Sequence, residues 1–131
     1  MDQAVLVEQK QSEGERLVRA LDGAGLPPSA AFWFYYPEAD LWNLILAGSQ
    51  FSASKGAPID PYRKIAGVTS QLKPPATAVS IADIRTVEEG DPIVIALRTM
   101  VHTGADISSI RLTNNFINGI HIADALVYRL Q

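Results

Sequence analysis

The chain has 131 residues, of which 47% are apolar and 19% are charged. This length and composition suit a single globular domain over residues 1–131 and exclude a disordered chain. The formal net charge is −3, and the basic residues are scattered, with Arg63 and Lys64 as their only adjacent pair. Binding to nucleic acid favours a basic cluster or stripe, so no nucleic-acid partner is predicted.

The sequence contains no cysteine, which excludes disulfide bonds, thiolate metal sites and cysteine nucleophiles. The N-terminal residues lack a basic flank and turn polar after four apolar residues, so we do not expect a signal peptide. The apolar run 41–47 is too short to cross a bilayer. These features predict a soluble, cytoplasmic protein with no membrane partner.

Residues 3–22 are predicted to form a helix with one apolar face and a polar middle that includes Gly14. Gly23 and Gly25 are expected to end it, as glycines commonly do at helix C-termini. These two glycines also form a G-x-G, but no strand precedes them and two prolines follow. A dinucleotide site is therefore not predicted.

Residues 30–47 are predicted to form a β-hairpin, because two β-prone runs flank a turn at residues 37–40. Large apolar side chains occupy both faces of this hairpin, whereas a half-solvated sheet alternates more cleanly between apolar and polar residues. The first strand directs Phe32, Phe34 and Tyr36 to one face and Trp33 and Tyr35 to the other. The second strand places Trp42, Leu44 and Leu46 opposite Leu41, Asn43 and Ile45. Both faces are therefore expected to be covered.

The middle of the chain is predicted to hold a small-residue loop, a helix and a strand. The loop covers residues 48–57 and is the candidate mobile segment. The helix is expected to begin with Asp60 as its N-cap and to end before the prolines of residues 73–76. Residues 77–87 then have the composition of a strand, with Asp83 on one face.

The C-terminal part is predicted to form a helix followed by a hairpin. Asp91 and the proline after it have the pattern of a helix start, and Gly104 is expected to end that helix. In the tail, Asn118 and Gly119 form the strongest turn signal, since both residues tolerate the positive φ of a type I′ turn. The pair at 114–115 is the rival turn or a bulge.

These elements follow the order αββαβαββ and predict an α+β fold. We expect a two-layer domain with a mainly antiparallel sheet of about five strands packed on helices. The alternative is a mixed sheet with helices on both faces, which the two-sided apolar strands suggest.

The sequence carries no metalloprotease, nucleophile-elbow or P-loop motif, and no cofactor or metal site is predicted. His102 is expected near a helix C-terminus, where its charged form suits the dipole. His121 and Asp124 suggest a base and its orienting acid, but their odd spacing sends them to opposite faces of a regular strand. Asp83 is a further candidate acid, because a carboxylate on an inner face must be paired or perturbed.

Two functions remain open from the sequence. The favoured one is an interaction or accessory protein without catalysis that forms a homodimer through the aromatic hairpin, with Trp33, Tyr35 and Trp42 as the interaction surface. The alternative is a small enzyme or ligand-binding domain with a site near the 48–57 loop that uses His121 with Asp83 or Asp124.

Overall fold

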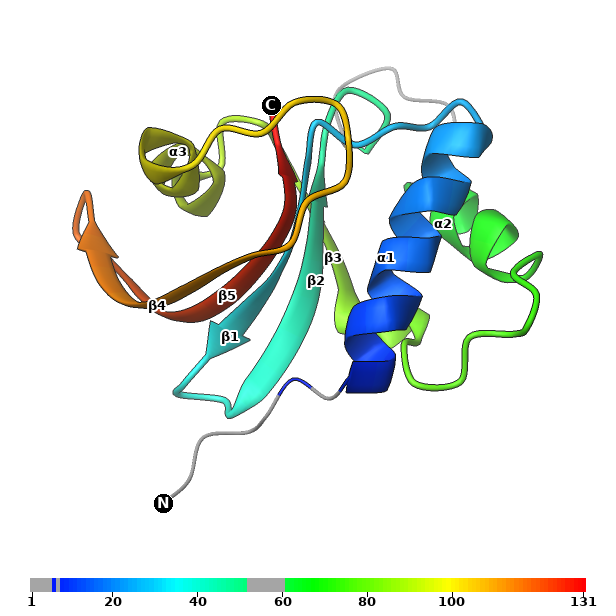
Figure 1. Ribbon diagram of the computed structural model, residues 1–131, viewed down its shortest axis with the longest axis horizontal. Helices are drawn as coiled ribbons and strands as arrows, with labels where there is room; N and C mark the ends of the chain where they lie inside the picture. The colour runs from blue at the N-terminus through cyan, green and yellow to red at the C-terminus, as the bar shows by residue number, and fades with distance from the viewer. Residues whose placement is uncertain (1–5, 7, 52–60) are drawn as a thin grey trace.

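The structure, a computed structural model, describes residues 6, 8–51 and 61–131. In this part of the chain, five strands form one sheet in the order β3-β2-β1-β5-β4 (Figure 1). Neighbouring strands pair antiparallel except β2 and β3, which run parallel. The strands are β1 (Ala30–Tyr36), β2 (Leu41–Ala47), β3 (Ile84–Val87), β4 (Ile110–Ile117) and β5 (Ile120–Leu130).

Three α-helices pack on this sheet within the described residues: α1 (Glu8–Gly23), α2 (Pro61–Thr69) and α3 (Pro92–Met100). Helices α1 and α2 lie on one side of the sheet, and α3 lies on the other (Figure 1). The α+β class, the element order and the mainly antiparallel five-stranded sheet are thus confirmed. The division of the helices between both faces is the arrangement of the alternative prediction.

The two faces of the sheet carry separate apolar cores. Trp33, Tyr35 and Trp42 belong to the cluster that includes residues of α1 and α2, whereas Phe32 and Phe34 belong to the cluster that includes residues of α3. This is the alternation predicted for the first hairpin. Because both of its faces carry large apolar side chains, both need to be covered: α1 and α2 cover one face and α3 covers the other.

A β-bulge in β5 ties the sheet to α1. The register between β1 and β5 shifts after Ala31, which pairs with Arg129, and Tyr128 is left without a partner on β1. Tyr128 accepts a hydrogen bond from Trp33 Nε1 at 3.0 Å, and the Arg129 guanidinium contacts Asp22 on α1 at 2.7 and 2.8 Å. The bulge thus directs two consecutive polar side chains toward the same helix.

Gly14 allows α1 to approach the sheet closely at this point. A Cβ atom on Gly14 would lie 2.8 Å from both Trp33 Nε1 and the Tyr128 oxygen. Such contacts are far inside van der Waals distance, so a larger residue would push the helix away from the sheet. The glycine that interrupts the polar middle of the predicted helix therefore has a packing role.

Glu13 joins α1 to the segment that precedes β3. Its carboxylate is 4% exposed and accepts hydrogen bonds from the backbone N–H groups of Ala78 and Val79 at 3.0 to 3.2 Å. Burial raises the pKa of Glu13, but these bonds and one from Gln9 outweigh it and lower the pKa to about 2. The ionised carboxylate therefore stabilises the packing of α1 against this segment.

Local details differ from the sequence predictions in two places. Residues 81–83 form a short 3-10 helix, η1 (Ile81–Asp83), so the strand predicted over 77–87 begins only at Ile84. Helix α3 ends before Val101, which places His102 beyond its last turn. The predicted N-cap Asp60 and most of the 48–57 loop lie outside the described residues.

The predicted start of the third helix and the predicted hairpin turn are both confirmed. Asp91 caps α3, because its side chain accepts a hydrogen bond from Ile93 N at 2.9 Å. Asn118 and Gly119 have φ values of 50° and 78°, as a type I′ turn requires. Asn114 also has a positive φ of 50°, but it lies inside β4 and does not form the turn.

Candidate functional site

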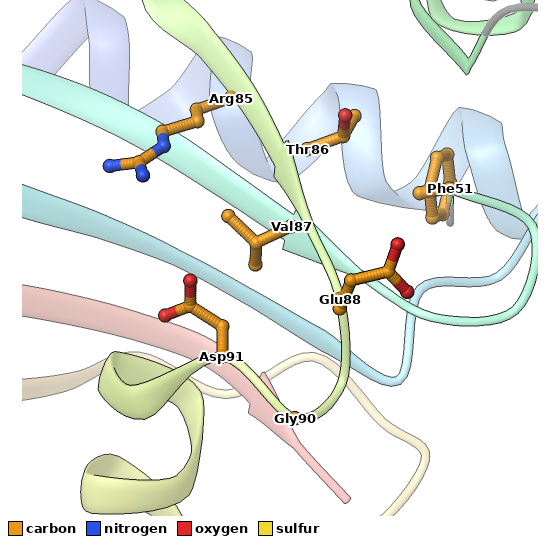
Figure 2. Close-up of a pocket in the computed structure, with 7 residues that line it drawn as sticks. All are labelled: Phe51, Arg85, Thr86, Val87, Glu88, Gly90 and Asp91. Carbon is orange, nitrogen blue, oxygen red and sulfur yellow. The ribbon is translucent and has the colours of Figure 1, made fainter. Parts of the chain in front are cut away.

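A hollow of about 510 Å³ lies where β3 leads into α3 (Figure 2). Its volume falls in the range of small-molecule sites, roughly 300–1,000 Å³. Phe51, the last described residue of the loop predicted as mobile, forms part of its wall. The lining residues are Phe51, Arg85, Thr86, Val87, Glu88, Gly90 and Asp91.

Arg85 is the cationic group of this hollow. Its Nη1 donates a hydrogen bond to the Tyr36 hydroxyl at 2.7 Å, and its guanidinium carbon lies 5.9 Å from the centre of the Tyr36 ring. Burial raises the pKa of Tyr36, while the Arg85 guanidinium opposes that rise. Tyr36 thus remains a neutral phenol at neutral pH and fixes the position of the guanidinium.

The acidic groups come from the turn between β3 and α3. Figure 2 shows the Asp91 carboxylate on the side of the hollow where Arg85 lies, whereas the Glu88 carboxylate points toward Phe51. The ion pairs among the described residues do not include Arg85 or Asp91. The hollow therefore presents opposite charges that do not neutralise each other directly.

The acids predicted as partners of His121 have structural contacts instead. Asp124 is held by Arg111 through two bonds of 2.5 and 2.6 Å. Asp83 accepts from Ser80 N at 2.9 Å and lies 3.8 Å from Lys10 Nζ. These contacts place Asp83, at the end of η1, beside α1, and Asp124 on the β4–β5 hairpin.

His121 lies near the turn of that hairpin and packs against a phenyl ring. Its imidazole stacks on Phe116 with 4.6 Å between ring centres and an interplanar angle of 15°. The residues predicted to form one site near the 48–57 loop, His121 with Asp83 or Asp124, contact different neighbours: Phe116, Lys10 and Arg111, respectively. The hollow near that loop uses other charged residues.

The aromatic residues predicted as an interaction surface are core residues. Trp33, Tyr35 and Trp42 are 0%, 4% and 6% exposed. Their face of the sheet is covered by helices of the same chain, so these side chains offer no surface to a partner. The prediction placed these residues at an interface because both faces of the hairpin are apolar, but helices of the same chain cover both faces.

The most exposed aromatic side chain among the described residues is instead Phe116, on β4. It is 74% exposed, whereas the other large apolar side chains exposed in the described residues reach 37–47%. Leu112 and Ile117 pack against the same cluster although five positions separate them, so the alternation of β4 breaks between them. Asn114, with its φ of 50°, lies at the break and leaves Phe116 on the outer face.

Sequence reasoning missed both Arg85 and Phe116. Arg85 is an isolated cation in a β-prone run, and the glycine and Asp91 after that run mark a turn that brings a carboxylate back toward it. This combination of a cation, a turn and a carboxylate is the sequence pattern that indicates the hollow. For Phe116 the signal is the asparagine pair just before it, a pattern that indicates a turn or a bulge.

No group of His, Asp and Glu side chains suitable for a metal ion occurs among the described residues. The same part of the chain contains no helix with the length and apolar character needed to span a membrane. Comparison with family models, curated proteins and solved structures finds no match to this chain.

Proposed function

We propose that the protein is a cytoplasmic interaction protein that acts through protein–protein contacts rather than catalysis. We further propose that it forms a homodimer through the outer face of the β4–β5 hairpin. The observation that carries this proposal is the 74% exposure of Phe116. The cytoplasmic location rests on the cysteine-free sequence.

The hairpin offers a preformed aromatic contact. Phe116 and His121 face each other across β4 and β5, and their stacked rings hold each other in one orientation. Rigid aromatic side chains lose little conformational entropy on binding, which is why they dominate many interfaces. The tight Asn118–Gly119 turn joins β4 and β5 beside this pair and so fixes the register that brings the two rings together.

A second copy of the chain suits this surface because the surface is close to neutral. In a two-fold contact the same patch meets itself, so an unpaired charge close to the axis would be repelled by its own copy. The charged side chain of β4 is Arg111, and it is paired with Asp124 of the same chain. The two aromatic pairs can therefore meet without bringing uncompensated charges together.

The proposal is tested by light scattering on the full chain across a roughly hundredfold dilution around micromolar concentration. We expect a dimer for the wild type and a monomer for Phe116→Ser. The matched control is Ile81→Ser, which removes an apolar side chain that is 42% exposed near the opposite sheet edge, and which should remain dimeric. A monomeric wild type, or a Phe116→Ser dimer, would contradict the proposed interface.

A further inference from the structure

The hollow between β3 and α3 places a cation and an anion around one space without pairing them. Arg85 comes from the edge strand β3, and Asp91 comes from the N-cap of α3. Figure 2 shows Val87 on the wall between them. A group that bridges this space can therefore accept hydrogen bonds at one end and donate them at the other.

The positions of both charged groups are fixed before any ligand arrives. Arg85 uses one of its five N–H donors on Tyr36 and keeps the others for a further acceptor. Asp91 uses one carboxylate oxygen, Oδ1, to cap α3 through Ile93 N. A preorganised site loses less entropy when it binds, which favours even a small ligand.

The charge of the lining limits the class of ligand. Among the described lining residues, Arg85 and Asp91 carry opposite charges, so Asp91 would repel a simple anion and Arg85 a simple cation. A bare metal ion is not favoured, because no metal-binding group of acids and histidines occurs among the described residues. A ligand that carries both an ammonium and a carboxylate can pair each of its charges with the opposite charge of the hollow, and it needs no metal-binding group.

The remaining walls of the hollow suit an apolar side chain. Val87 contributes half-buried apolar surface, Phe51 is a buried part of the wall, and Gly90 has no side chain to fill the space. We propose that this hollow binds an apolar α-amino acid as its zwitterion, with the carboxylate on Arg85 and the ammonium on Asp91. This ligand site is separate from the dimer contact, because β3 and β4 form opposite edges of the sheet.

The test uses L-leucine as the probe and backbone amide shifts of the full chain as the readout. L-leucine should shift the amides of Thr86 and Gly90 in a saturable manner. Two derivatives each remove one charge: N-acetyl-L-leucine lacks the ammonium, and L-leucinamide lacks the carboxylate. Because a hydrogen bond to a charged group contributes about 1.5–3 kcal/mol, each derivative should bind at least about tenfold more weakly.

The variant Arg85→Gln assigns the carboxylate end. It should bind L-leucine and L-leucinamide with similar, weak affinity, while its spectrum remains that of the folded chain. Arg19→Gln is the matched control, since Arg19 is an exposed residue of α1 paired with Glu15, and it should bind L-leucine like the wild type. The proposal is overturned if L-leucine leaves these amides unshifted, if the two derivatives bind as tightly as L-leucine, or if Arg85→Gln retains the preference for the free carboxylate.

Discussion

Replacing Glu13 by glutamine tests the most perturbed carboxyl group in the described structure. The substitution keeps the size of the side chain but removes the charge that Ala78 N and Val79 N donate to. Moving a carboxyl pKa from 4.5 to about 2 corresponds to roughly 3 kcal/mol of stabilisation by the charged form. Since the glutamine carbonyl can still accept one of these bonds, we expect Glu13→Gln to lower the free energy of unfolding by about 1–3 kcal/mol at pH 7.

The pH dependence of this loss identifies its cause. Because the folded-state pKa of Glu13 lies below its unfolded value, the stabilisation is complete above pH 4.5 and disappears as the pH falls toward 2. Urea denaturation of the wild type and the variant should therefore give free energies that converge over this interval. Glu15→Gln is the control: Glu15 forms an exposed pair with Arg19, and its loss should change the free energy by less than about 1 kcal/mol. A difference between the wild type and Glu13→Gln that stays constant from pH 6 to pH 2.5 would refute the reasoning.

Two further substitutions test close packing and turn geometry. Gly14→Ala should destabilise the fold by about 1–3 kcal/mol in urea denaturation, because the added methyl group meets a buried indole and a phenol at 2.8 Å. This loss should exceed the gain from the higher helix propensity of alanine. A stabilised variant would mean that α1 can shift away from the sheet without cost. Gly119→Val should lower the free energy of unfolding by about 1 kcal/mol or more, because a β-branched residue resists a φ of 78°, and an unchanged thermal midpoint would contradict the importance of this turn.

The elements that local sequence determines were predicted well. The first hairpin, the cap of α3 and the Asn118–Gly119 turn follow from residue types within a few positions of each other, and each occurs as expected. The alternation of the first strand also indicated that both of its faces would be covered. These are the features for which periodicity and turn chemistry are sufficient.

Features that depend on distant parts of the chain were not predictable in this way. The bulge that turns both Tyr128 and Arg129 toward α1 depends on the pairing of β5 with β1. The exposure of Phe116 depends on the break in alternation at Asn114, which a strict two-residue period does not contain. The hollow forms because Arg85 and Asp91 come from two elements joined by a turn, so its residues form no sequence motif.

The position of β5 has a consequence for how the chain folds. The two hairpins, β1–β2 and β4–β5, are local in sequence and can form early, within microseconds. The sheet becomes continuous only when β1 meets β5, and the residues joined there, such as Phe34 and Ala125, are about 90 to 100 positions apart. Closing so long a loop costs entropy before the two apolar cores can form. We therefore expect the docking of the two hairpins to be the slow step of folding and contacts across the β1–β5 seam to set its rate.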